Sequence, residues 1–353
     1  MNHQPVDATT ATSFLPMVSV VIPIYNGEAD LPDLLNCLLS QTYPKDRVEY
    51  LLVDNNSSDR TLIILKASAE NCPITIHPLS ENQIQSSYSA RNTGIRAAKG
   101  EIIVFTDADC RPQPQWLDAL IEPFVNKEVV IVAGEILALP GTTLLEQHAD
   151  RQETLSQKHT LGHSFRPYGQ TANLAIRRLA LEKAGLFRPY LTTGGDADIC
   201  WRILGENIGR LEFAPNAIVR HRHRATLQEL ESQWRRYGRS NRYLHELHGV
   251  DLMPEMTLKE YGYRLVRWLL KEVPRDIKNA IAQPALRPNS WRRYANGAGS
   301  RQASSLTIAG IAAKATLVDL LNTPIGLFTA RARAAGQRDT KLPENAKIID
   351  RLS

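Results

Sequence analysis

Residues 101–120 read EIIVFTDADCRPQPQWLDAL and join an apolar run to two carboxylates, Asp107 and Asp109, separated by one alanine. The apolar run predicts a buried strand. On extended backbone, residues two apart face the same side, so both carboxylates would point at one spot. Without a cation, their repulsion would keep one of them protonated. Mg²⁺ or Mn²⁺ removes this conflict and can bridge to phosphate oxygens. An exposed acidic turn is the alternative interpretation.

Apolar segments of strand length alternate with helical segments on both sides of this stretch. Strands are predicted at 17–26, 49–56, 74–79 and 129–136, and helices at 31–41, 60–70, 86–100 and 113–124. This alternation predicts an α/β fold, a mostly parallel sheet with helices on both faces. Ligands of such sheets bind at the carboxyl ends of the strands. Tyr25, Asn26, Asp54, Asp107 and Asp109 all follow or end predicted strands, so they are candidate site residues.

Charge is distributed unevenly along the 353 residues. Residues 1–200 carry 16 Lys and Arg against 23 Asp and Glu, whereas residues 201–353 carry 26 against 14. The basic part indicates an anionic partner, such as phospholipid headgroups, a lipid-linked pyrophosphate or nucleic acid, or else a solvated basic surface. We expect a disordered N-terminus over 1–15, an α/β catalytic domain over 16–225 and a basic helical extension over 226–353.

Four widely spaced cysteines, without CxxC or metal-type spacing, indicate reduced thiols in a cytoplasmic protein. The N-terminal residues lack the charged and apolar regions of a signal peptide, and no apolar run is long enough for a transmembrane helix. The segment YGYRLVRWLLKEV, residues 261–273, is amphipathic and basic. Such a helix either packs on protein through its apolar face or lies peripherally on the inner face of the plasma membrane.

Four ordered segments resemble glycosyltransferase family 2, whose members have the GT-A fold. They are VSVVIPIYNGEADLPDLLNCLLSQTYP (18–44), YLLVDNNSSDRT (50–61), SARNTGIRAAKGEIIVFTDADC (89–110) and GGDADICWRI (194–203). The resemblance implies that Asp54 receives the base of a nucleotide-sugar, that Asp107 contacts the ribose side and that Asp109 holds the metal. It further implies a nucleotide pocket lined by Pro23, Tyr25 and Asn26, with Arg91 reaching the diphosphate. From the residues alone, Arg91 could equally form a salt bridge with the two acids.

The segment TTGGDADICWRI, residues 192–203, supplies the candidate general base. Glycines before an acid suit a tight turn that projects a side chain into a cleft. The resemblance implies that Asp196 deprotonates the acceptor hydroxyl, and the alternative is that it caps the following helix. Family members usually carry Glu directly before this Asp, whereas this chain has Gly195. The departure leaves either the base less elevated in pKa or the acceptor less well held.

Two histidines in AIVRHRHRATL, residues 217–227, are candidates to complete the metal site, as a histidine does in many GT-A enzymes. His221 is the first choice and His223 the second, and imidazole favours Mn²⁺ over Mg²⁺. Either histidine could instead belong to a basic surface.

The acceptor and leaving-group side is also implied by resemblance. QTANLAIRRLALEKAGLF (170–187) resembles the acceptor-side loop and helix, with Gly169, Asn173 and Phe187 shaping it. Gln233–Tyr237 resembles the Gln-x-x-Arg-Trp element, with Arg236 placed to neutralise the leaving diphosphate. Tyrosine in place of tryptophan, together with the lack of transmembrane segments, argues against a polymerising synthase.

The expected activity is therefore a metal-dependent, inverting, non-processive glycosyltransferase of polysaccharide biosynthesis that uses Mn²⁺ or Mg²⁺. Its donor would be a nucleotide-sugar, most simply a UDP-sugar, and its acceptor a saccharide or lipid-linked hydroxyl. A non-catalytic nucleotide-sugar-binding or scaffold protein is the alternative that Gly195 raises. A nucleotidyltransferase would need a Gly-rich, basic first loop, which IPIYNGEADLP is not. Nucleic acid is not an expected partner, since only the basic C-terminal part favours it.

Overall fold

The computed structural model describes residues 14–70, 72–282 and 305–352, and the chain divides into two compact units. The first unit comprises Met1–Ile136, Ser156–Arg220 and Glu344–Ser353, and the second comprises Leu137–Leu155 and His221–Pro343. Both units are therefore built from separate stretches of the sequence.

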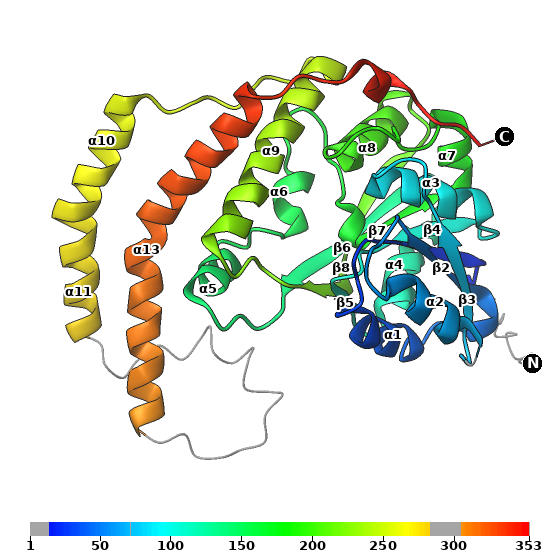
Figure 1. Ribbon diagram of the computed structural model, residues 1–353, viewed down its shortest axis with the longest axis horizontal. Helices are drawn as coiled ribbons and strands as arrows, with labels where there is room; N and C mark the ends of the chain where they lie inside the picture. Colours follow the sequence, from blue (N-terminus) through cyan, green and yellow to red (C-terminus); the bar gives the residue numbers. More distant parts are fainter. Residues whose placement is uncertain (1–13, 71, 283–304, 353) are drawn as a thin grey trace, which may run out of the picture. The chain divides into compact units, whose positions relative to one another are not determined.

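An eight-stranded sheet forms the centre of the first unit (Figure 1). Its order is β3-β2-β1-β4-β7-β6-β8-β5, and β1 pairs in parallel with β2 and β4, as β2 does with β3. β7 is antiparallel to both β4 and β6. The predicted α/β class is confirmed, with a mixed sheet whose first four strands are parallel. The strands are β1 (Val18–Ile24), β2 (Val48–Asp54), β3 (Thr75–Ser80), β4 (Ile102–Phe105), β5 (Cys110–Pro112), β6 (Val129–Ala138), β7 (Leu174–Arg177) and β8 (Arg210–His221).

Helices cover the sheet through apolar faces. In α1 (Leu31–Leu39), Leu31, Leu34 and Leu38 recur at helical spacing and are buried in the core against β1 and β2. Every residue of β1 and β2 is buried, as expected for parallel strands covered on both faces. The other helices of this unit are α2 (Thr61–Glu70), α3 (Ser87–Ala97), α4 (Trp116–Ile121), α6 (Gln157–Leu161), α7 (Arg178–Ala184) and α8 (Gly195–Gly205).

The parallel strands bring their carboxyl ends to one edge. Ile24 at the end of β1 is in register with Asp54 at the end of β2, and Asp54 with Ser80 at the end of β3. β4 runs parallel to β1 on its other side and ends at Phe105. The segments after β1, β2 and β4 therefore leave the sheet at the same edge, where this class of fold binds its ligands.

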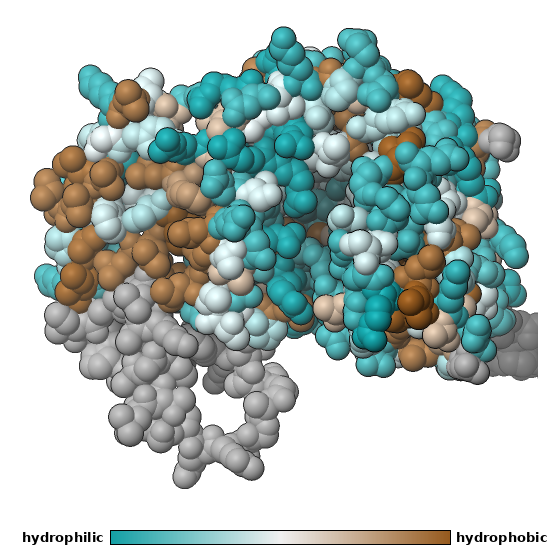
Figure 2. Space-filling view, viewed as in Figure 1, coloured by the Kyte–Doolittle hydropathy of each residue, from teal (hydrophilic) through white to brown (hydrophobic). Residues whose placement is uncertain are grey.

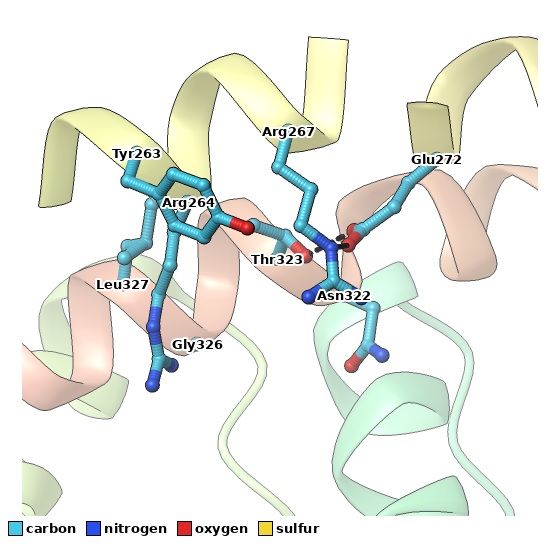
Figure 3. A pocket seen from close by; sticks show the side chains of 8 residues that line it. All are labelled: Tyr263, Arg264, Arg267, Glu272, Asn322, Thr323, Gly326 and Leu327. Atoms are coloured by element: carbon cyan, nitrogen blue, oxygen red, sulfur yellow. Dashed lines mark hydrogen bonds and ion pairs between the residues drawn. The ribbon is translucent and has the colours of Figure 1, made fainter. Parts of the chain in front are cut away.

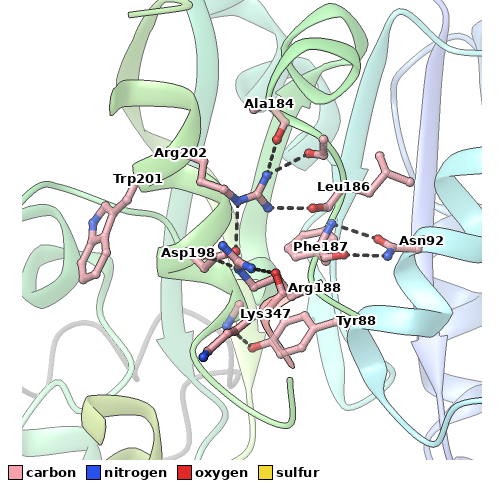
Figure 4. A network of polar contacts seen from close by, with 12 residues as sticks. Tyr88, Asn92, Ala184, Leu186, Phe187, Arg188, Asp198, Trp201, Arg202 and Lys347 are labelled. Carbon is pink, nitrogen blue, oxygen red and sulfur yellow. Dashed lines mark hydrogen bonds and ion pairs between the residues drawn. The ribbon is translucent and has the colours of Figure 1, made fainter. Parts of the chain in front are cut away.

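A segment near the C-terminus packs on the first unit. The backbone N–H of Leu186 donates to the carbonyl of Asp350 over 2.7 Å, and Asn92 of α3 donates to the Asp350 carboxylate over 3.1 Å. Arg96 of α3 forms an ion pair with the same carboxylate, and Arg188 donates to the carbonyl of Lys347 (Figure 4). These contacts attach residues 347–350 to the helix that carries Arg91.

The second unit is helical: α5 (Leu144–Arg151), α9 (Leu227–His248), α10 (Leu258–Arg267), a π-helical turn (Trp268–Glu272), α11 (Val273–Ala282) and α13 (Ser305–Arg338). α9 and α13 approach each other closely at two glycines. A Cβ on Gly238 would lie 1.9 Å from the Arg333 carbonyl, and one on Gly336 would lie 2.0 Å from that of Arg235. Any larger residue would separate the two backbones. Within the described ranges, no helix combines the length and apolarity needed to cross a bilayer.

Candidate active site

Asp54 ends β2 and is buried, and its Oδ1 atom has no hydrogen-bond partner among the described residues. Buried polar atoms in native proteins are nearly always paired, so an orphaned carboxylate oxygen at the ligand edge of a sheet suits an N–H donor from a ligand. The side-chain amino group of the neighbouring Asn55 has no donor left for a ligand, because it donates to the carbonyls of Glu81 and Ile84.

The three predicted pocket residues at the end of β1 differ in their exposure and contacts. Asn26 has a positive φ of 49°, and its Oδ1 accepts from the backbone N–H of Ser58 over 2.9 Å. It therefore supports the loop that follows Asp54. The ring of Tyr25 is 58% exposed, whereas Pro23 is buried within β1. Tyr25 and Asn26 are therefore both exposed, but the side-chain oxygen of Asn26 is already engaged by Ser58.

Arg91 and Asp107 form an ion pair of 2.6 Å, Nη2 to Oδ1. Arg91 lies on α3 with its side chain 4% exposed, and its Nε has no partner among the described residues. Asp107 is partly exposed. The pairing holds the guanidinium at the sheet edge, with donor capacity left for an anion. Both sequence interpretations of Arg91, salt bridge and anion contact, are compatible with this geometry.

The expectation that Asp107 and Asp109 share one face of an extended strand is wrong. β4 ends at Phe105, and the backbone N–H of Cys110 donates to the Asp107 carbonyl over 3.1 Å, which closes a four-residue turn. Alternation does not apply within a turn, so the two carboxylates take separate roles. Asp107 binds Arg91, and Asp109 immediately precedes β5.

Asp196 is the second residue of α8, whose N-cap is Gly194 at φ 80°. Its Oδ1 accepts from Thr171 Oγ1 over 3.0 Å and its Oδ2 from the Thr171 backbone N–H over 3.3 Å. Burial raises the pKa of Asp196 and the charge of Asp107 adds to the rise, while Arg91 and the Thr171 hydrogen bonds oppose it. A carboxylate with raised pKa, held at two points, has the properties of a general base.

Tyr88 occupies the space in which a side chain at position 195 would lie. A Cβ on Gly195 would be 2.7 Å from two atoms of the Tyr88 ring, and the Gly195 backbone N–H donates to the Tyr88 hydroxyl over 2.9 Å. The ring stacks on Phe187 with centroids 5.5 Å apart, and the Arg91 guanidinium lies 5.5 Å from its centroid. A side chain at position 195 would therefore clash with the Tyr88 ring.

Asp198, two residues after Asp196, is structural. It is fully buried between the Nε atoms of Arg188 and Arg202, at 3.0 and 3.1 Å (Figure 4). Arg202 also donates to the carbonyls of Ala184, Gly185 and Leu186. This network fixes α8 against the segment after α7, and so fixes the turn that presents Asp196.

The candidate metal ligands lie at the ends of strands that neighbour each other in the sheet. Asp109 precedes β5, β5 lies beside β8, and the backbone N–H of Gln113, just after β5, donates to the Ile218 carbonyl over 3.0 Å. His221 ends β8 and is buried, with Nδ1 2.7 Å from the Arg222 carbonyl. A backbone carbonyl on Nδ1 fixes the tautomer and ring orientation as it does in metal-binding histidines. A carboxylate and a neutral imidazole are a donor set that fits Mn²⁺.

His223 is also buried, and burial lowers its pKa to about 4, with His221 adding to this effect and Asp150 opposing it. It is therefore neutral at physiological pH.

The remaining predicted residues are dispersed. The Asn173 side chain lies in the core, accepting from Trp116 Nε1 and donating to the carbonyls of Glu135 and Ala217. Its amide is fully used, so it supports the strands around Thr171. Phe187 is buried against Tyr88, and Gly169 is packed against Leu174. Arg236 lies on the exposed side of α9, in the second unit.

Sequence reasoning missed two residues, Thr171 and Tyr88, that contact the candidate base or its turn. Tyr88 lies three residues before Arg91, a spacing that places both on one face of a helix, and this signal could have found it. Thr171 is 25 residues from Asp196, and no local pattern connects the two.

Comparisons with known proteins identify the family of this chain. The family description "Glycosyl transferase family 2" matches residues 19–187. The chain is 35% identical over 229 residues to glycosyltransferase AglE of Haloferax volcanii, covering 64% of this chain and 73% of that protein. It is 28% identical over 307 residues to the pre-mycofactocin glycosyltransferase of Mycobacterium tuberculosis, covering 84% of this chain but only 61% of that protein.

Among solved structures, the fold is similar to that of mannosyltransferase PcManGT from Pyrobaculum calidifontis, a complex with GDP-Man and Mn²⁺. The TM-score is 0.56 at 19% identity, with 96% of this chain and 92% of that chain covered. The family match, the AglE relationship and the shared architecture lead to one conclusion. This chain belongs to glycosyltransferase family 2, with the GT-A fold, and is a glycosyltransferase.

Proposed function

We propose that this protein transfers a sugar from a nucleotide-sugar to an acceptor hydroxyl with inversion at the anomeric carbon, with Asp196 as general base. The observation that carries the proposal is the cluster around Asp196. Two hydrogen-bond donors from Thr171 hold its carboxylate, and burial raises its pKa. The charge of Arg91 lowers this pKa and the charge of Asp107 raises it. The base and the predicted donor site thus belong to one compact unit.

In the proposed reaction, the acceptor hydroxyl gives its proton to the Asp196 carboxylate as its oxygen bonds to the anomeric carbon. The bond from that carbon to the diphosphate oxygen breaks in the same displacement, and the nucleoside diphosphate leaves. Thr171 keeps the carboxylate oriented for the proton transfer. Because a raised pKa makes Asp196 a stronger base than an ordinary aspartate, it suits removal of a proton from a poorly acidic hydroxyl.

The nucleotide would be bound by residues at the strand ends. The orphaned Oδ1 of Asp54 would accept an N–H of the base, and the exposed ring of Tyr25 would lie against the base or ribose. Arg91, with Nε unpaired among the described residues and Nη2 on Asp107, would contact the diphosphate. We propose a UDP-sugar as the donor, since uracil offers an N–H to Asp54. The acceptor would be a saccharide or lipid-linked hydroxyl.

Asp109 and His221 would hold Mn²⁺ or Mg²⁺. The ion, when bound, would stabilise negative charge on the leaving diphosphate as a Lewis acid. Asp107 would keep Arg91 oriented.

The test begins with a panel of UDP-, GDP- and other nucleotide-sugars, scored by thermal stabilisation with and without Mn²⁺. A donor at 100 times its Kd stabilises by about 2.7 kcal/mol. We expect one UDP-sugar to raise the thermal stability of the protein, the other nucleotide-sugars not to do so, and the increase to be larger with Mn²⁺. Selective stabilisation by GDP-mannose would overturn the UDP assignment while leaving the rest of the proposal intact.

Hydrolysis of the selected donor then separates an enzyme from a binding protein. Asp109→Ala should abolish the Mn²⁺-dependent release of nucleoside diphosphate. A chain that binds donor but releases no nucleoside diphosphate under any condition would instead be a non-catalytic nucleotide-sugar-binding protein. Glu206→Gln, an exposed substitution at the end of α8, is the matched control.

A further inference from the structure

α10 presents apolar side chains to solvent. None of its residues is buried, and Leu258, Leu265 and Val266 are 91%, 44% and 53% exposed. Leu269, Leu270 and Ile277 continue the exposed apolar set into the π-helical turn and α11. Figure 2 shows hydrophobic residues gathered over α10 and α11. A contiguous apolar surface of this kind marks an interaction site.

The orientation of α10 is the reverse of that of an ordinary packed helix. At about 100° per residue, Leu258, Leu265 and Val266 fall within one arc of about 100°. Tyr263, Arg264 and Arg267 fall on the opposite side and line a cavity of about 510 Å³ between α10 and α13, together with Asn322 and Thr323 (Figure 3). The polar face therefore lies toward the protein, and the apolar face points away from it.

One basic residue borders the apolar arc: Lys259 lies next to Val266 on the helical wheel, whereas Arg264 lies on the cavity side. Between residues 258 and 272 there are four basic residues against two acidic ones, Glu260 and Glu272. Glu272 is paired with Arg267 at 3.3 Å and also accepts from Thr323.

We propose that the α10 surface binds an anionic lipid bilayer, with its apolar arc inserted among the acyl chains and Lys259 at the level of the phosphates. An apolar face bordered by basic residues is the pattern of helices that lie in the membrane interface. A second copy of this chain fits less well. In a two-fold interface the bordering cations of both copies would come together and repel, whereas lipid phosphates neutralise them.

Vesicle flotation of the full chain tests this proposal, which is independent of the proposed reaction. The chain should float with vesicles of phosphatidylglycerol and phosphatidylcholine, and much less with phosphatidylcholine alone. Leu258→Asp combined with Val266→Asp should reduce binding at least tenfold, since two inserted apolar side chains become charged. Ile63→Asp combined with Leu179→Asp, at positions 68% and 55% exposed in the first unit, is the matched control.

Lys259→Gln should weaken binding to the phosphatidylglycerol vesicles about fivefold and flatten its salt dependence. Arg47→Gln, an exposed arginine of the first unit, should change neither. Thermal melting of each variant establishes that it is folded. The proposal is overturned if the wild-type chain does not float, or if the double aspartate variant floats like wild type. It is equally overturned if that variant's only effect is to convert a dimer into a monomer.

Discussion

Replacing Gly195 with alanine tests whether Tyr88 sets the geometry of the catalytic turn. The added Cβ would lie 2.7 Å from Cε1 and Cζ of Tyr88 and 2.9 Å from Cδ1. These distances are shorter than protein structures tolerate, so the ring or the turn must move by several tenths of an ångström. The ring has little freedom to do so, because it stacks on Phe187 and its hydroxyl accepts from the Gly195 N–H.

Overpacking of this kind typically costs about 1–3 kcal/mol. For a unit of roughly 200 residues, as the first one is, each kcal/mol lowers Tm by roughly 2–4 °C. A displaced turn also moves the adjacent Asp196, and a shift on the order of 1 Å at a reacting group can cost about 10²-fold in rate. We therefore expect Gly195→Ala to lower Tm by several degrees and kcat by one to two orders of magnitude, roughly.

Urea unfolding and nucleoside diphosphate release would measure the two effects. Gly262→Ala is the matched control: it is a helical glycine with no atom within 4 Å of the position that a Cβ would take, so alanine should stabilise α10 by up to about 1 kcal/mol. Adding Tyr88→Ala to Gly195→Ala should recover part of the strain, visible as coupling in a double-mutant cycle. A Gly195→Ala protein as stable and active as wild type would refute the steric explanation of this glycine.

Three further outcomes follow from the buried charges. Asp196→Asn should lower kcat by about 10²–10⁴-fold, and the wild-type rate should rise with pH through a midpoint above that of an ordinary aspartate. Because the pKa of Asp196 is raised in the folded state, its contribution to stability is lost as pH rises, so the asparagine variant should have a higher Tm than wild type at neutral pH. If the asparagine variant kept the wild-type pH profile of kcat, Asp196 would not be the general base. Asp198→Asn leaves Arg188 and Arg202 without their buried partner and should cost about 3–5 kcal/mol in urea unfolding; a loss below 1 kcal/mol, roughly the value of an exposed pair, would show that the network is dispensable. The pKa of His223 is lowered to about 4, so the stability that it contributes is present above its unfolded pKa and is lost as pH falls toward 4. His223→Gln should therefore flatten the decline in Tm over that acidic range. If Tm declined equally in the variant and in wild type, His223 would not be the source of the decline.

The sequence was most informative where chemistry and local pattern coincide. Buried parallel strands read as apolar runs, and the polar residues after β1, β2 and β4 could be assigned to one sheet edge because parallel strands end together. The order of the later strands could not be predicted. β7 is only four residues long, yet it lies between β4 and β6, and its pairing to Ile103 joins residues more than seventy positions apart.

The positions of the candidate site residues could be predicted only in part, for the same physical reason. Asp54, Arg91, Asp107 and Asp196 belong to ordered motifs, and the structure places them in one unit. Thr171, which holds Asp196, and the turn that separates the roles of Asp107 and Asp109 depend on tertiary contacts. The amide of Asn173 has no freedom to reach a ligand, because the Trp116 ring and two carbonyls occupy it, and no periodicity reports such a contact.

Attachment of residues 347–350 to α3 has a consequence for biosynthesis. The helix that carries Arg91 makes hydrogen bonds to Asp350, which the ribosome adds some 250 residues later. Domains generally fold as units while the chain emerges. Here the first unit gains its contacts to Asp350 only after the helical second unit has been translated.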